Sequence, residues 1–231
     1  MRIIFVRHGK PDYKTDSLLE IGKEQARTVA ERLRDEKISE IYASTMGRAL
    51  QTAEPLSKML GLEIKKCDFM REIGWGNAAD GEELRFGGHP WLTVPDMIIK
   101  GEDIDSRTWR DEEPFLKNNK LKETIDRVIS GGDKWLSELG FSREGKLYRV
   151  TKDNENKTVA MVSHGGASTA LLAHMLNIPF LRFLYTFRPY FTSVTVIEMV
   201  GKVGNLCAPR IKLLSDDRHV PRDDDTGLIE N

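Results

Sequence analysis

Short runs of apolar residues and longer amphipathic stretches alternate along the first third of the chain. The continuous apolar run at 2–7 predicts a buried parallel strand, and two further strands are expected at 39–44 and 62–66. Residues 20–36 carry apolar side chains at helical spacing, and residues 47–60 predict a second helix that ends at Gly61. The order strand, helix, strand, helix, strand predicts an α/β sheet.

This alternation stops over residues 67–120, which are rich in glycine, proline and tryptophan. Because the stretch holds many aromatic residues, it predicts an ordered loop and a small helical cap rather than disorder. We place the inserted cap at residues 77–120. The helical pattern resumes over residues 121–139, whose apolar side chains form one stripe.

The second half of the chain predicts further strands and helices. Two strand-like runs, residues 146–151 and 157–163, are separated by the polar residues 152–156 and predict a hairpin. Helices are then expected at 166–177 and 179–187, strands at 192–200 and 208–214, and a loose acidic tail at 215–231. We therefore expect one domain over residues 1–231, a three-layer α/β/α sandwich with a mostly parallel sheet and a small inserted cap.

The composition is that of an ordinary globular protein, with 39% hydrophobic and 31% charged residues. The formal net charge is −1, from 35 basic and 36 acidic residues, so no overall field would draw the chain to nucleic acid or to a membrane. No apolar run is long enough for a membrane span or a signal-peptide core, which favours a cytoplasmic protein. The two cysteines, Cys67 and Cys207, are expected to be reduced thiols. The sequence does not predict an oligomeric state.

Two histidines stand directly behind predicted strands. The triplet Arg7-His8-Gly9 follows the first strand, and His164 follows residues 159–163 and precedes Gly165-Gly166. Ligands of open α/β sheets bind at the carboxyl ends of parallel strands. Both imidazoles are therefore expected to face one substrate.

Five side chains together suit phosphoryl transfer. His8 can attack an electrophile through a neutral imidazole nitrogen, while Arg7 and Arg48 offer planar forks that match phosphate oxygens. Glu72 can protonate a leaving alkoxide, with Glu82 or Glu83 as substitutes, and His164 can donate to the remaining oxygens. Such a set needs no metal and no cofactor, and the chain contains neither an HExxH motif nor an EF-hand loop.

Four fragments in this order resemble the histidine phosphatase superfamily, which includes phosphoglycerate mutases and phosphatases. They are residues 7–9, 44–53, 71–76 and 163–166, and the resemblance covers about residues 1–76 and 120–200. It implies that His8 is phosphorylated and that Glu72 first protonates the leaving group and then activates water. It also implies that Arg7, Arg48 and His164 hold the phosphoryl oxygens.

The chain departs from the family pattern at two positions beside the proposed site. Lys10 stands where the family usually has glutamate or glutamine, and Gly76 with Asn77 replaces the usual Glu-Gly. We predict Lys10 and the backbone of Gly165 as further substrate contacts. The segment that marks glycolytic mutases is absent near residues 11–25.

The resemblance favours a phosphatase of small phosphate esters over a phosphoglycerate-mutase-like phosphotransferase. A phosphate- or phosphoprotein-binding module without activity is the alternative from a different class, but a binder has no use for a proton donor.

Five other residues have weaker expectations. Arg188 and Tyr190 precede the strand at 192–200, and either can line the site if that strand is antiparallel to the others. His89 is expected to be a loop residue, His174 a packing or surface residue and His219 a solvated tail residue.

Overall fold

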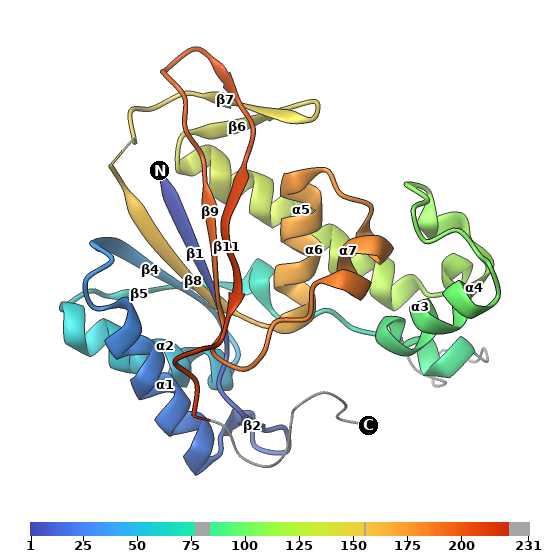
Figure 1. Cartoon of the computed structure of the whole chain (residues 1–231), viewed down its shortest axis with the longest axis horizontal. Coiled ribbons are helices and arrows are strands. Elements are labelled where there is room, and N and C mark those ends of the chain that lie inside the picture. Colours follow the sequence, from blue (N-terminus) through green and yellow to red (C-terminus); the bar gives the residue numbers. More distant parts are fainter. Residues whose placement is uncertain (77–83, 155, 222–231) are drawn as a thin grey trace.

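The structure, a computed structural model, describes residues 1–76, 84–154 and 156–221. Its centre is a six-stranded sheet in the order β11-β9-β1-β8-β4-β5 (Figure 1). The strands are β1 (Arg2–Arg7), β4 (Ile38–Ser44), β5 (Ile64–Cys67), β8 (Thr158–Ser163), β9 (Val194–Glu198) and β11 (Arg210–Asp216). Strands β1, β8, β4 and β5 are parallel, and β9 runs antiparallel to β1. The sheet is mostly parallel, as predicted.

Helices cover both faces of this sheet, which gives the three predicted layers. Helices α1 (Glu20–Leu33) and α2 (Gly47–Leu60) lie on one face, and α5 (Asn119–Glu138) and α6 (Gly165–Leu176) on the other (Figure 1). Successive residues of β1 point into opposite cores: Ile4 belongs to the cluster with α1 and α2, and Phe5 to the cluster with α5 and α6. Apolar residues on both faces therefore hold β1 at the centre of the fold.

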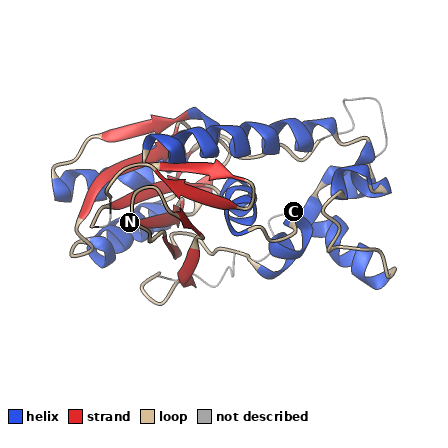
Figure 2. Cartoon of the chain, turned by 90° about the horizontal axis from the view of Figure 1, so that it is seen from above, coloured by secondary structure: helices blue, strands red, loops and turns tan. Residues whose placement is uncertain are grey.

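Short helices between β5 and α5 form the region where the sequence predicts a cap. They are η1 (Asp68–Met70), η3 (Arg85–Gly88), α3 (Pro90–Ile99), η4 (Trp109–Asp111) and α4 (Glu113–Leu116). Figure 2 shows η3, α3, η4 and α4 gathered at one end of the molecule, beyond the strands, whereas η1 packs against α5 and β4. Val94 and Phe115 are fully buried in the same core cluster as Phe5 of the sheet, so this segment packs on the main core. Residues 77–83 of the predicted cap lie outside the described residues.

The predicted hairpin of residues 146–151 and 157–163 is wrong. Strand β7 (Leu147–Val150) pairs with β6 (Phe141–Glu144) and β10 (Leu206–Cys207) in a separate three-stranded sheet. All six residues of β8 are buried, and β8 lies between β1 and β4. A fully buried strand is stabilised by neighbours on both sides, whereas β7 buries only alternate residues, so the two runs join different sheets.

The last described residues pack against the core, which differs from the expected loose tail over residues 215–231. Strand β11 continues to Asp216, and Val220 is buried. His219 donates from Nε2 to the carbonyl of Thr192 at 3.1 Å, so it is a packed rather than a solvated residue. The rest of the predicted tail, residues 222–231, lies outside the described residues.

Three further elements, two short strands and a helix, complete the described part of the chain. A small antiparallel pair, β2 (Pro11–Asp12) and β3 (Ser17–Leu18), follows β1, and helix α7 (Phe180–Thr186) precedes β9. No helix within the described ranges has the length and apolar character to cross a membrane.

Candidate active site

The two histidines meet at the carboxyl edge of the parallel sheet, as predicted from their positions behind strands. His8 follows β1 and His164 follows β8, its neighbour in the sheet. Their ring centroids lie 5.1 Å apart in an edge-to-face arrangement, and both side chains are almost completely buried. The sheet register therefore fixes the position of both imidazoles.

The hydrogen bonds of His8 determine its tautomer. Nδ1 lies 2.8 Å from the carbonyl oxygen of Gly9, which can only accept, so Nδ1 carries the proton. Nε2 then has a free lone pair and accepts a hydrogen bond from Nε of Arg48 at 3.2 Å. Position 9 requires glycine because a Cβ atom there would lie 2.5 Å from the carbonyl oxygen of Gly22. The turn after β1 thus holds a neutral imidazole with Nε2 available as a nucleophile.

The surroundings of His8 favour this neutral form. Burial is the main reason that the pKa of His8 lies well below its ordinary value, and the charges of Arg7 and Arg48 lower it further. At neutral pH the imidazole is therefore unprotonated, which is the state that nucleophilic attack requires.

His164 has one partner and one unsatisfied nitrogen. Its Nε2 lies 2.8 Å from Oγ of Ser44, the last residue of β4. Its Nδ1 is buried and has no hydrogen-bond partner among the described residues. Burial lowers the pKa of His164 well below its ordinary value, with a smaller contribution from His8. Without ligand, His164 is therefore a neutral side chain that can hydrogen bond to a bound group.

Arg7 and Arg48 approach the same space from different elements. Arg7, the last residue of β1, donates from Nη1 to the carbonyl of Pro189 at 3.0 Å, and its guanidinium lies 4.0 Å from the ring centre of Phe191. Arg48, in the first turn of α2, is buried and forms an ion pair with Asp16. Both guanidinium groups are thus held in place before any ligand binds.

Asp16 is a positioning residue that sequence reasoning missed. One carboxylate oxygen pairs with Arg48, and the other accepts from the backbone N–H of Gly47 at 2.6 Å. Asp16 lies between β2 and β3, in a loop with no sequence pattern that links it to α2. Ser44 was also missed as a partner of His164, although its place at the end of β4 could have suggested it.

Glu72 lies against the N-terminus of α6. Its carboxylate accepts hydrogen bonds from the backbone N–H groups of Ile73 and Ala167, both at 2.9 Å, and from Gly166 at 3.4 Å. Burial nevertheless raises the pKa of Glu72, although these three bonds and the charge of Arg7 act in the opposite direction. A raised pKa suits a carboxyl group that first donates a proton.

A cavity of about 480 Å³ opens beside these groups, and Arg7, Arg48 and Glu72 are part of its wall. It is lined by Arg7, Tyr13, Arg48, Glu72, Trp75, His89, Trp91, Gly165, Arg188 and Pro189. We call Arg7, Arg48, Glu72 and Gly165, together with His8 and His164 buried behind them, the phosphate side, because His8 contacts Arg48 and packs against His164. We call Trp75, His89, Trp91 and Arg188 the aromatic side. In the described part of the chain, no group of three His, Cys, Asp or Glu side chains is arranged to hold a metal ion.

The sequence predicted only part of the aromatic side. Strand β9 is antiparallel to β1, and Arg188 lines the cavity, as predicted on that condition. Tyr190 packs its ring against Phe191 instead. His89, expected to be an ordinary loop residue, lines the cavity and packs against Trp75 at 5.2 Å between ring centroids.

Two other candidates, Lys10 and His174, are not among the described residues that line the cavity. The backbone N–H of Lys10 donates to Gln25 at 2.8 Å. A role for its side chain in substrate binding stays a prediction. His174 pairs with Asp133 at 3.0 Å, which agrees with its expected packing or surface role. Glu82 and Glu83, the substitutes for Glu72, lie outside the described residues.

Comparison with known proteins places this arrangement in a family. Two curated relatives are the probable phosphoglycerate mutases GpmB of Enterobacter sp. strain 638 and of Yersinia pestis strain Pestoides F, 28% and 26% identical, each with 91% of this chain and 97% of the relative covered.

Solved structures with a similar fold include two phosphatases. The phosphoserine phosphatase of Entamoeba histolytica, solved with 3-phosphoglyceric acid, has a TM-score of 0.63 at 22% identity, with 95% of this chain and 99% of that chain covered. The mycobacterial glucosyl-3-phosphoglycerate phosphatase has a TM-score of 0.64 at 21% identity, with 93% and 98% covered. The family model of the histidine phosphatase superfamily, branch 1, matches residues 3–208. The chain therefore belongs to the histidine phosphatase superfamily.

Proposed function

We propose that this protein is a phosphomonoesterase that hydrolyses small phosphate esters through a phosphorylated His8. The observation that carries this proposal is the state of His8: a neutral imidazole whose Nε2 lone pair lies beside the guanidinium of Arg48. Arg7 and Arg48 supply positive charge for the phosphoryl oxygens, so the transfer needs no metal.

The first step transfers the phosphoryl group to the enzyme. Nε2 of His8 attacks phosphorus, and the bond from phosphorus to the ester oxygen breaks. The leaving oxygen takes the proton of Glu72, which burial keeps available by raising the pKa of that carboxyl. The hydrogen bond from Nδ1 of His8 to the Gly9 carbonyl stabilises the positive charge of the phosphorylated ring.

The second step returns the enzyme to its starting state. Glu72, now a carboxylate, takes a proton from water as the water oxygen attacks phosphorus. The bond between phosphorus and Nε2 of His8 breaks, and inorganic phosphate leaves. Arg7, Arg48 and His164 hold the phosphoryl oxygens in both steps.

A phosphoglycerate-mutase-like phosphotransferase is the second candidate, favoured by relatives named as probable phosphoglycerate mutases. A mutase would use the same phosphorylated His8 but transfer the group to an alcohol of its substrate instead of to water. The two activities therefore differ in the acceptor and not in the nucleophile.

Hydrolysis in ¹⁸O-labelled water tests the proposal. A panel of phosphate esters, including phosphoglycerates, should release phosphate that carries one ¹⁸O atom per turnover. His8→Asn should abolish release, whereas His174→Asn, which changes a histidine outside the cavity lining, should not. Isomerised phosphoglycerate without labelled phosphate would establish the mutase instead, and release by His8→Asn at the wild-type rate would contradict both.

A further inference from the structure

The cavity is larger than its phosphate side requires. A volume of about 480 Å³ falls within the range of sites that enclose a whole small molecule, whereas a phosphoryl group fills only a small part of it. The aromatic side must therefore contact the part of the substrate that carries the phosphate. Its residues indicate which chemistry that part has.

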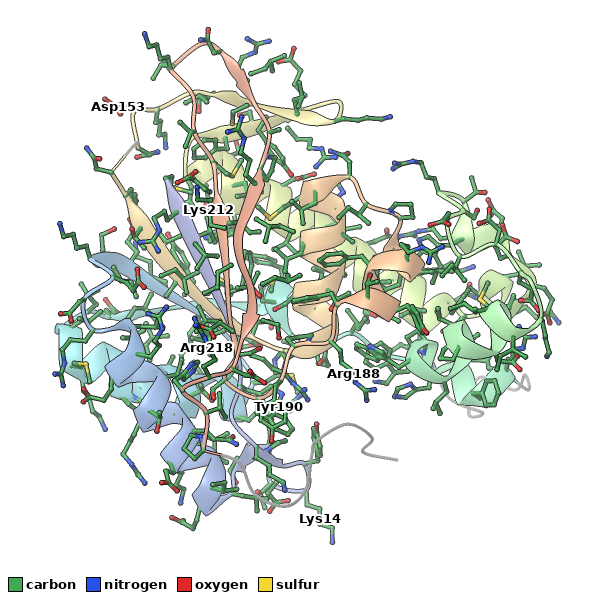
Figure 3. All side chains as sticks on the ribbon, in the orientation of Figure 1. Lys14, Asp153, Arg188, Tyr190, Lys212 and Arg218 are labelled. Atoms are coloured by element: carbon green, nitrogen blue, oxygen red, sulfur yellow. The ribbon has the colours of Figure 1, made fainter. Side chains whose placement is uncertain are left out.

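Arg188 is the cation of the aromatic side. It lies on the connection between α7 and β9, two residues before Tyr190 (Figure 3). It differs from the other arginines near this end of the molecule: Arg182 pairs with Asp105, and Arg85 pairs with Glu102. Among the described residues Arg188 has no hydrogen bond or ion pair. Its guanidinium therefore has its donors available within the cavity wall.

The backbone that carries Arg188 is fixed relative to the phosphate side. The carbonyl of Pro189, the next residue, accepts the hydrogen bond from Arg7, and the backbone N–H of Thr192 donates to the carbonyl of Arg7 at 3.0 Å. Phe191 lies under the guanidinium of Arg7. The same short segment thus connects the two arginines, so the distance between the two sides of the cavity does not depend on a loosely held loop.

Three aromatic rings line the same cavity as the two cationic sites. Trp75 packs against His89 and, edge-to-face at 4.6 Å between centroids, against Trp91. All three rings are partly exposed and line the cavity, so they present an apolar surface to a bound carbon skeleton. The charge of Arg188 reaches this wall, since it lowers the pKa of His89 after the larger effect of burial.

We infer that Arg188 binds a second anionic group of the substrate, so that the preferred substrates are small phosphate monoesters that also carry a carboxylate or a second phosphoryl group. A guanidinium matches both anions through two parallel hydrogen bonds. This inference rests on the proposed function for the phosphate end of the substrate. Arg188 is in this view a specificity-determining residue that contacts the non-reacting end.

Matched aryl phosphates test the inference in the whole protein. Each pair consists of carboxyphenyl phosphate and its methyl ester, which differ mainly in one negative charge. Both the 3-substituted and the 4-substituted pair are used. Wild-type enzyme should favour a carboxylate isomer, and Arg188→Gln should raise KM for it about tenfold with little change in kcat, because binding to a remote group acts equally on ground and transition states. Arg188→Lys should recover part of the loss, since it keeps the charge but not the fork.

Arg182→Gln is the matched control, because it removes a charge from α7 outside the cavity lining. It should leave the preference for the carboxylate unchanged. If Arg188→Gln and wild type had equal KM and kcat for both the 3- and the 4-carboxyphenyl phosphate, the inference would be overturned. Hydrolysis through His8 would be unaffected by that result.

Binding of probes that cannot be hydrolysed separates this inference from the proposed function. Calorimetry with carboxybenzylphosphonate, its methyl ester and xylylene bisphosphonate should show tighter binding of the two probes that carry a second anionic group, and loss of that difference in Arg188→Gln. These two probes also distinguish a carboxylate from a second phosphoryl group. This pattern without any hydrolysis would support the inference and contradict the proposed function. Equal binding of all three probes to wild type would overturn the inference.

Discussion

The phosphate side and the aromatic side of the cavity are built in different ways. On the phosphate side, His8 and His164 are buried at the ends of adjacent parallel strands, and Arg48 stands in the first turn of a helix. On the aromatic side, Trp91 and Arg188 come from connections between secondary-structure elements or from a short helix and are partly or largely exposed.

This difference suggests that the phosphate side carries out the reaction and that the aromatic side selects the substrate. Groups that must keep a fixed geometry and a shifted pKa are placed where packing and burial hold them, and they suit one reaction on any phosphate ester. Groups on connections can differ without disturbing the sheet, and they suit recognition of one substrate among many. Changes on the phosphate side should therefore lower kcat broadly, whereas changes on the aromatic side should alter KM for particular substrates.

Glu72→Gln should give the largest difference between substrates. A glutamine cannot protonate a leaving group, so alkyl phosphates should lose about 10²–10⁴ in kcat/KM, which reports the transfer to His8, while 4-nitrophenyl phosphate, whose leaving group needs no proton, should lose much less in kcat/KM. Glu123→Gln, on an exposed position of α5, serves as control. Steady-state rates on both substrates check this, and equal losses would show that Glu72 is not the acid.

The pH dependence of the rate also tests the roles of His8 and Glu72, because the pKa values of both side chains are shifted. The rate should rise as pH rises through the lowered pKa of His8, because only the neutral imidazole attacks. It should fall as pH rises through the raised pKa of Glu72, because the acid form is then lost. In Glu72→Gln the fall at high pH should disappear for alkyl phosphates. A fall that persists in this variant would assign it to another group.

Arg48→Lys should lower kcat/KM about 100-fold on every substrate, because lysine keeps the charge but loses the planar fork and the contact with Nε2 of His8. Arg34→Lys changes an exposed arginine that pairs with Glu31 and should have no effect. A loss confined to one substrate would mean that Arg48 selects substrates, which would contradict its place on the phosphate side.

Gly165 and Gly166 are adjacent, but an alanine at each position should affect Glu72 differently. A Cβ atom on Gly166 would lie 2.7 Å from Oε1 of Glu72 and 2.6 Å from Cγ1 of Ile73, whereas one on Gly165 would meet Arg7 at 3.6 Å, an ordinary contact. Gly166→Ala should therefore displace Glu72 and lower kcat on alkyl phosphates about tenfold, and Gly165→Ala should cost much less. Similar rates for the two variants would show that Glu72 tolerates the displacement.

Tyr13→Leu should give the smallest effect. The ring of Tyr13 is 55% exposed at the cavity wall, and its centre lies 5.4 Å from the guanidinium carbon of Arg48. Such an exposed contact contributes about 0.5–1 kcal/mol, so KM should rise about twofold to fivefold at unchanged kcat. Tyr185→Leu, an exposed tyrosine on α7, is the control. A large fall in kcat would place Tyr13 in the chemistry instead.

The same division explains what could be predicted from the sequence. His8 and His164 were predictable because strand ends of a parallel sheet meet at one edge, whatever the intervening chain does. The partner of Arg48 was not, because Asp16 reaches it from a loop whose path depends on the packing of β2 and β3. The hairpin prediction failed because neighbouring runs were assumed to pair, whereas the fully buried β8 joined the central sheet.

Trapping of the phosphorylated enzyme tests the central claim most directly. Wild-type protein should be mixed with a ³²P-labelled aryl phosphate, quenched in alkali within one turnover and digested for peptide mapping. The account predicts an acid-labile, base-stable phosphate on the peptide that contains His8, absent in His8→Asn and retained in His174→Asn. Hydrolysis without any labelled protein, or a label on a peptide other than that of His8, would contradict the account.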